Sequence, residues 1–185
     1  MKISETNLAG AYILENDIYK DNRGSFTCFY VEDDFKKNNL NTKWKQINSS
    51  LSFDERTLRG LHFQYPPYSQ TKLVRVIQGS IFDVIVDIRP KSKTFGKYFF
   101  YVLNENNNKM LYISNGFAHG FITMENNTKI IYNVSEPYKP EYEETIIWND
   151  KFLNIQWPKS PLKLSSKDLN GIKFNELKIE ILKRL

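Results

Sequence analysis

The 185-residue sequence contains a single cysteine, Cys28. One cysteine cannot form a disulfide within the chain, which excludes the disulfide-rich secreted folds and favours a reducing compartment. The sequence also lacks an apolar run near the roughly 20 residues that a membrane-spanning helix needs. Residues 1–7 contain no apolar core of a signal peptide. We therefore predict a soluble, cytoplasmic protein that has no membrane partner.

Histidine is scarce as well, since only His62 and His119 occur and no His-x-His pair is present. Protein sites for transition metals usually draw several histidines, cysteines or acids into one cluster. The shortage of histidine therefore argues against a metal centre, and we predict that the protein holds no metal.

The charge balance is moderately basic, with a formal net charge of +5. Such an excess permits an anionic ligand. Nucleic-acid-binding surfaces usually gather their basic residues into a stripe or patch, whereas the lysines here are scattered along the chain. We therefore predict no nucleic-acid partner.

The pattern of apolar residues predicts an all-β protein. Aromatic residues, which are enriched in β-strands, are abundant, with 13 Phe and 11 Tyr. Short runs of period two alternate with turn signals, and helical spacing is confined to residues 31–38 and the C-terminal tail. The apolar positions of that tail are Ile172, Phe174, Leu177, Ile181 and Leu185. No linker or repeat is visible, so we expect one antiparallel sandwich or barrel domain over residues 1–185.

The most informative stretch runs from Arg59 to Gln64 and continues, after Pro66-Pro67, from Gln70 to Gly79. It contains His62 and, ten residues later, Lys72. Both halves have strand character, so we predict that the two side chains lie on adjacent strands and point into one space. A base beside a cation suits proton abstraction next to a carbonyl, because the cation stabilises the enolate. Read alone, such a pair is more often a structural histidine and a solvated lysine, because most charged residues lie on solvated faces.

Polar residues on two further strands admit two interpretations each. Gln46 and Asn48 share one face of a strand at 44–52, and that face could meet solvent or line a polar cavity. Asp83 shares a strand face with two isoleucines, and a buried acid needs a partner. That partner could be a histidine, held in one tautomer, or Lys72.

Several motifs together resemble the dTDP-4-dehydrorhamnose 3,5-epimerase family of cupins. They are the stretch 59–74 described above, Asp21-Asn22-Arg23-Gly24-Ser25-Phe26, Gly116-Phe117-Ala118-His119-Gly120-Phe121 and Leu164-Ser165-Ser166-Lys167-Asp168. The resembling pieces extend over about residues 21–168. The resemblance implies a cupin jelly roll, also called a double-stranded β-helix, with a few short helices, and it implies a homodimer.

The resemblance also implies a reaction. The expected activity is epimerisation at C3 and C5 of a nucleoside-diphosphate 4-keto-6-deoxysugar of the dTDP-4-dehydro-6-deoxyglucose type, without a cofactor. His62 would remove the proton, Lys72 would stabilise the enolate, and Tyr132 would return a proton from the opposite face. Asp168 would hold the tautomer of His62. From the residues alone, Tyr132 could instead be a core residue and Asp168 a helix N-cap.

Further residues are expected to bind the substrate. By resemblance, the nucleotide would contact Arg23 and Phe26, often across a dimer interface, and the sugar would contact Gln46 and Asn48. Cys28 stands where the family often has a glutamate that recognises thymine, which predicts weaker base specificity. The remaining expected contacts are Arg59, Lys167 and His119, together with Arg23, at the diphosphate, and Tyr138 and Glu143 near the substrate.

Other functions remain open at this stage. The nearest alternatives are a C3-only epimerase and a 3,4-ketoisomerase acting on a related sugar. A metal-dependent cupin oxygenase would need more histidines than this chain has. A non-catalytic sugar-binding cupin would not need His62, Lys72 and Tyr132 together.

Overall fold

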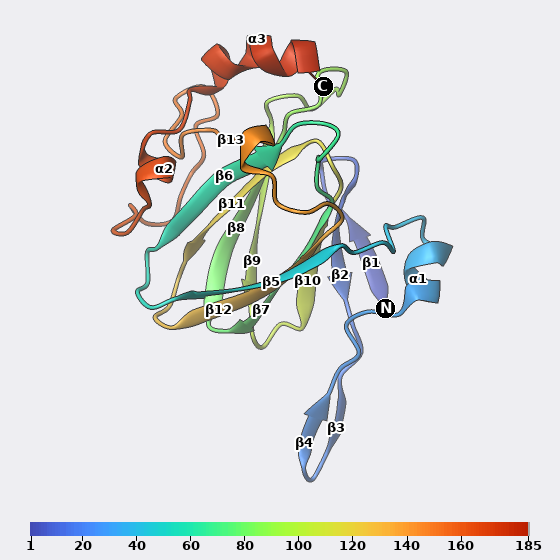
Figure 1. The fold of residues 1–185 in the computed structure, drawn as a ribbon. Coiled ribbons are helices and arrows are strands. Elements are labelled where there is room, and N and C mark those ends of the chain that lie inside the picture. Colours follow the sequence, from blue (N-terminus) through green and yellow to red (C-terminus); the bar gives the residue numbers. More distant parts are fainter. Residues whose placement is uncertain (185) are drawn as a thin grey trace.

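The computed structural model describes residues 1–184, which form a sandwich of two antiparallel β-sheets (Figure 1). The spatial order in the six-stranded sheet is β1 (Lys2–Glu5), β2 (Ala11–Glu15), β10 (Lys109–Ile113), β7 (Lys72–Gln78), β12 (Thr128–Val134) and β5 (Gln46–Ser52). In the five-stranded sheet it is β13 (Glu143–Thr145), β6 (Leu58–Gln64), β11 (Phe117–Thr123), β8 (Ser80–Asp87) and β9 (Tyr98–Asn104). The predicted all-β jelly roll is confirmed.

Several short elements lie outside the two large sheets. They are the hairpin of β3 (Tyr19–Asp21) and β4 (Gly24–Phe26), the helices α1 (Glu32–Lys37), α2 (Ser166–Leu169) and α3 (Phe174–Arg184), and the 3-10 turn η1 (Pro140–Tyr142). Acidic residues begin α1 and lysines end it, as the helix dipole favours. In the described part of the chain, no helix is long and apolar enough to cross a membrane.

The amphipathic tail is confirmed as helix α3, which covers the five-stranded sheet (Figure 1). Phe174, Leu177 and Ile181 are buried on its inner face and belong to the same apolar cluster as residues of β6 and β8. Ile172 lies just before the helix, and Leu185 lies outside the described residues.

Strand β8 is buried along its whole length because both of its faces are covered. Val84 belongs to the apolar cluster that also contains the inner face of α3. Ile81 and Ile85 belong to a second cluster, which packs against residues of the six-stranded sheet. Because side chains alternate along a strand, Asp83 shares the face of the isoleucines and lies inside the barrel, fully buried.

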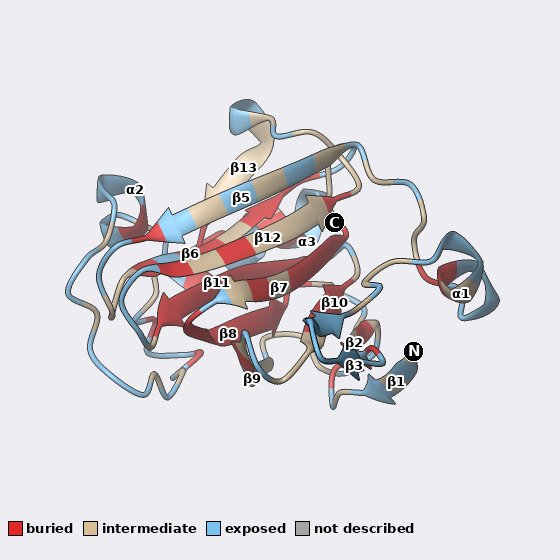
Figure 2. Ribbon diagram, turned by 90° about the horizontal axis from the view of Figure 1, so that it is seen from below, coloured by how far each residue is buried: buried red, intermediate tan, exposed pale blue. Residues whose placement is uncertain are grey.

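The alternation of strand β5 also places polar side chains inward. Gln46, Asn48 and Ser50 are partly buried, whereas Ile47 and Leu51 on the opposite face are 66% and 43% exposed. Figure 2 shows this alternation of exposed and covered positions along β5, at the edge of its sheet. This face therefore points toward the other sheet rather than to bulk solvent, and Ser50 on it lines the cavity between the sheets, whereas Gln46 and Asn48 lie outside the cavity lining.

The predicted adjacency of the strands that carry His62 and Lys72 is wrong. His62 lies on β6 and Lys72 on β7, and these strands belong to different sheets. The segment between them, broken at Pro66-Pro67, carries the chain from one sheet to the other instead of turning it back beside itself. The two side chains nevertheless reach one space, because they line the same cavity from opposite sheets.

Candidate active site

A cavity of about 220 Å³ opens between the two sheets. Its lining residues come from both sheets and from the segment at α2: Ser50, Arg59, His62, Lys72, His119, Phe121, Ile130, Tyr132, Ser165 and Asp168. All four side chains that were expected to be catalytic, His62, Lys72, Tyr132 and Asp168, are therefore brought together.

The imidazole of His62 is held by a buried carboxylate. His62 Nε2 lies 2.6 Å from Asp168 Oδ1, and the same oxygen accepts a hydrogen bond of 3.2 Å from the Gly60 N–H. Burial raises the pKa of Asp168, but hydrogen bonds from His62 and Ser165 and the charge of His62 outweigh it, so that pKa lies below its usual value. Asp168 therefore stays ionised and can orient the imidazole.

Asp168 is not the N-cap of α2. That position belongs to Ser165, whose hydroxyl accepts a hydrogen bond from the Asp168 N–H. The alternative of a capping role for Asp168 is therefore wrong. Its carboxylate is free to bind His62 because serine satisfies the helix terminus.

A second histidine–carboxylate pair lies beside the first. His119 on β11 stands directly across from His62 in the sheet, and its Nε2 lies 2.6 Å from Asp83 Oδ1. The open question of the partner of Asp83 is thereby answered: it binds a histidine, and it forms no ion pair with Lys72. His119 is only 8% exposed and faces the interior of the cavity.

Lys72 supplies a buried positive charge. It is 8% exposed, and within residues 1–184 its ammonium makes no ion pair shorter than 4 Å. Burial lowers its pKa to about 8, although the charges of Glu143 and Asp83 pull in the opposite direction. An ammonium without a partner in the cavity wall is available to an anion that forms there.

Tyr132 faces the histidines from the other sheet. It lies on β12 and is half-buried, with its ring packed against the core cluster between the sheets. Burial raises the pKa of its hydroxyl, and the positive charge of Arg59 lowers that pKa by less. The phenol therefore stays protonated at neutral pH and can donate a proton.

Other expected binding residues form a polar group apart from the cavity lining. The Tyr138 hydroxyl donates to Glu143 Oε2 over 2.7 Å, and Lys167 pairs with the same oxygen. The hydrogen bond from Tyr138 to Glu143, helped by burial and by the negative charge of Glu143, raises the pKa of Tyr138 to about 12. Gln46 links the group to β5, because its side-chain oxygen accepts from the Tyr138 N–H and its amide donates to Asn48.

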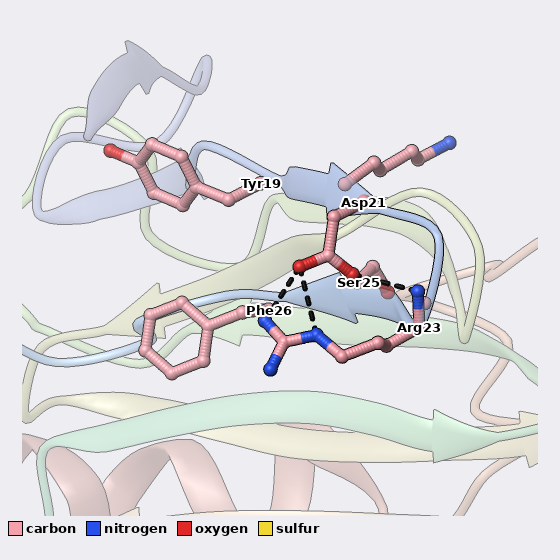
Figure 3. A pocket seen from close by; sticks show the side chains of 7 residues that line it. Tyr19, Asp21, Arg23, Ser25 and Phe26 are labelled. Atoms are coloured by element: carbon pink, nitrogen blue, oxygen red, sulfur yellow. Dashed lines mark hydrogen bonds and ion pairs between the residues drawn. The ribbon is translucent and has the colours of Figure 1, made fainter.

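The β3–β4 hairpin extends away from the barrel and carries Arg23 and Phe26 with it (Figures 1 and 3). The Arg23 guanidinium binds the Asp21 carboxylate at 2.6 Å, and the Phe26 ring lies 6.5 Å from that of Tyr19. Both Arg23 and Phe26 line a separate hollow on the hairpin, so the structure of one chain does not bring them to His62. Cys28 follows the hairpin and is exposed.

Four lining residues were not anticipated: Ser50, Phe121, Ile130 and Ser165. The alternation of β5 could have indicated Ser50, which shares a face with Gln46 and Asn48. Ser165 had a signal as well, since a serine three residues before Asp168 suits a helix N-cap. Nothing local marked Phe121 or Ile130, which read as ordinary strand residues.

No group of three or more histidine, cysteine, aspartate or glutamate side chains in residues 1–184 is arranged to hold a metal ion. Metal independence stays a prediction, which the activity after dialysis against a chelator would test.

Comparison with known proteins identifies the family. The sequence model of dTDP-4-dehydrorhamnose 3,5-epimerase matches residues 5–176. The chain belongs to the dTDP-4-dehydrorhamnose 3,5-epimerase family. The resemblance seen in its motifs is thereby confirmed, and so is the cupin form of the jelly roll, which is the fold of these epimerases.

Individual epimerases match over nearly their whole length. The Shigella flexneri enzyme is 39% identical, over 94% of this chain and 96% of its own. The Bacillus anthracis epimerase, solved with TDP and pyrophosphate bound, has a TM-score of 0.90 and 41% identity, covering 94% of this chain and 99% of its own. The Legionella pneumophila epimerase, solved with dTDP-4-keto-L-rhamnose, has a TM-score of 0.93 and 35% identity, covering 100% and 98%.

Proposed function

We propose that the chain catalyses epimerisation at C3 and C5 of a nucleoside-diphosphate 4-keto-6-deoxysugar of the dTDP-4-dehydro-6-deoxyglucose type. Membership of the family and the ligands of its solved members support this reaction. The observation that carries it is the placement of His62, paired with Asp168, and Tyr132 on opposite walls of one cavity that also contains Lys72.

The roles of the residues follow from that placement. The 4-keto group acidifies the C–H bonds at C3 and C5, and His62 removes one of these protons. The electrons move onto the keto oxygen, where the Lys72 ammonium stabilises the enolate. Tyr132 then donates a proton to the carbon from the opposite face, which inverts it. Asp168 stabilises the imidazolium that forms in between.

The polar residues at and near the cavity would bind the rest of the substrate. Arg59 lines the cavity and, with Lys167, would contact the diphosphate, while Gln46, Asn48 and the Tyr138–Glu143 pair would contact the sugar. His119 was expected at the diphosphate. Its burial beside Lys72 and Asp83 instead supports a place near the keto oxygen.

A homodimer would complete the nucleotide site. Arg23 and Phe26 are exposed on a hairpin that extends from the barrel, where they can reach a second copy. The outer face of the six-stranded sheet exposes Ile47 and Leu51, and Arg75 nearby has a buried Nε without a partner. Such a surface suits contact with another chain. Cys28, also near the hairpin, would then lie toward the base of the nucleotide.

Two expectations extend this proposal to the whole protein. The chain would act as one domain over residues 1–185, and it would work in the cytoplasm. A limited-proteolysis experiment tests the first, since a single domain yields no stable half.

Deuterium exchange tests the reaction itself. The protein is incubated in D2O with dTDP-4-keto-6-deoxyglucose and followed by proton NMR. We expect deuterium at C3 and C5 with inversion at both carbons, and no exchange with His62→Ala. Exchange at C3 alone would indicate a C3-only epimerase, and a product with its keto group at C3 would indicate a 3,4-ketoisomerase. Normal exchange by the His62→Ala variant would refute the assignment of the base.

A further inference from the structure

The Ser165 hydroxyl makes two hydrogen bonds to the same residue. It accepts from the Asp168 N–H at 3.1 Å, which caps helix α2. It also donates to Asp168 Oδ2 at 2.7 Å, and it lines the cavity. One hydroxyl therefore fixes both the backbone and the carboxylate of Asp168.

The other hydrogen bonds of the Asp168 carboxylate all involve Oδ1, so the bond from Ser165 to Oδ2 is the one that fixes how the carboxylate is turned. Its other oxygen, Oδ1, is occupied by His62 Nε2 and the Gly60 N–H. Asp168 is only 2% exposed, whereas Ser165 is exposed, so the serine hydroxyl is the protein donor that lies between Oδ2 and solvent. With both oxygens held, the carboxylate plane has one orientation, in which Oδ1 faces the imidazole.

We propose that Ser165 is a positioning residue for the His62–Asp168 pair, which it holds by binding the carboxylate oxygen that His62 does not use. This inference rests on the proposed function, in which His62 is the base. Without the serine hydroxyl, Asp168 would still pair with His62 through Oδ1, but its carboxylate would no longer hold the imidazole in one fixed orientation.

The loss of the hydroxyl has an expected direction. A carboxylate with one donor fewer is more basic, so it stabilises the imidazolium of His62 more strongly and raises the pH at which His62 loses its proton. The other titratable or charged groups around His62 are Arg59 on its own strand, Lys72 on β7, His119 on β11 with Asp83 on β8, Tyr132 on β12 and Glu143 on β13. None of these changes when Ser165 is replaced.

Three variants separate the carboxylate contact from helix capping. Ser165→Gly removes the hydroxyl but keeps a residue that is well tolerated at an N-cap. Ser165→Thr keeps a hydroxyl in the same place. Ser166→Ala is the matched control, because Ser166 is exposed and its hydroxyl makes no hydrogen bond within residues 1–184.

Two measurements are made on each variant. The first is the pH dependence of kcat and KM for the ketosugar. The second is an NMR titration of nitrogen-15-labelled histidine, which is simple to assign because the chain has two histidines. The titration needs no turnover, so it tests Ser165 even if the wild-type protein fails to epimerise the sugar.

For Ser165→Gly we expect kcat to fall about tenfold with little change in KM, since a hydrogen bond to a charged group is lost. The titration of His62 and the acidic limb of kcat should both move upward, by about half a pH unit or more. Ser165→Thr should restore both, and Ser166→Ala should match the wild type. A His62 titration that stays in place or moves downward in Ser165→Gly overturns the proposal, as does a kcat within twofold of wild type.

Discussion

At the scale of single residues, Lys72 is a buried lysine, only 8% exposed, that lines the cavity. Burial lowers its pKa from 10.5 to about 8, so at neutral pH most molecules still hold the ammonium. Because this pKa is close to neutral, a rise in pH from 7 to above about 8 removes the charge from most molecules. This placement suits a cation that meets a transient oxyanion, and it makes the activity sensitive to alkali.

We expect kcat to fall as the pH rises through about 8, because neutral Lys72 can no longer stabilise the enolate by charge. The sign for stability is opposite. Since the folded-state pKa lies below the unfolded value, the unfolded chain binds the proton more tightly, and this group adds stability as the pH rises from 8 toward 10.5. A pH–rate profile with no alkaline limb below pH 9.5 would contradict the role of Lys72.

Lys72→Met should separate function from stability. Methionine fills a similar volume without a charge, so the variant should lose enolate stabilisation and exchange almost no deuterium. The cost of burying the ammonium, on the order of 3 kcal/mol for this pKa difference, should disappear, and Tm should rise. Thermal unfolding at pH 7 measures this change. A lower Tm would show that the ammonium has a favourable partner in the folded protein.

Tyr132→Phe should uncouple exchange from inversion. The variant removes one hydroxyl and keeps the ring in its core cluster, so the fold should survive. His62 can still remove a proton, but without a donor on the other wall the enolate is reprotonated mainly from its original face. Proton NMR in D2O should then show deuterium uptake with little inverted sugar. Equal loss of both signals would instead assign Tyr132 to substrate positioning.

At the scale of elements, the β3–β4 hairpin stands apart from the barrel and makes few contacts with it (Figure 1). Its strands pair only with each other, and Phe26 is 66% exposed. An aromatic ring in such a position contributes little to folding. Its contribution is expected in binding, where it can stack on a nucleotide base.

Phe26→Ala should therefore raise KM for the nucleotide sugar about tenfold while leaving Tm within about 1 °C, because a base-stacking contact of 1–3 kcal/mol is lost. The matched control is Phe53→Ala, which removes another exposed phenylalanine outside the hairpin and should leave KM unchanged. Steady-state kinetics and thermal unfolding of both variants decide the point. An unchanged KM in Phe26→Ala would remove the hairpin from the nucleotide site.

At the scale of the whole molecule, the question is whether one chain contains a complete site. The cavity holds the proposed catalytic side chains, whereas the hairpin residues line a separate hollow. If the hairpin of one copy completes the cavity of another, the functional unit is a dimer with two shared sites. Each site would then take its catalytic residues from one chain and its nucleotide-binding hairpin from the other.

Complementation tests this arrangement. A hairpin variant, Arg23→Ala with Phe26→Ala, is unfolded and refolded together with His62→Ala. The hairpin variant alone is expected to be weakly active, and His62→Ala alone inactive. In a mixed dimer one site has an intact cavity and an intact hairpin, so random mixing should restore about a quarter of the wild-type activity. Activity no greater than the average of the two separate variants would show that each hairpin serves its own chain or none.

The strands, the class of fold and the family could be predicted from local sequence patterns and motifs. Period-two alternation and turn signals are local properties, so β5, β8 and β12 could be placed without tertiary information. The identities of His62, Lys72, Tyr132 and Asp168 as cavity residues were also predictable, because motif spacing links them to a known family. Their geometry confirms that they meet.

Which strands pair and which face each other could not be predicted, because this depends on how the whole chain packs. A jelly roll pairs strands that are distant in sequence, so the segment at Pro66-Pro67 could not reveal that β6 and β7 belong to opposite sheets. The same holds for the pairing of Asp83 with His119 and for the second bond of Ser165 to Asp168. Each of these contacts depends on where a side chain lies after packing, and local sequence preferences do not specify that position.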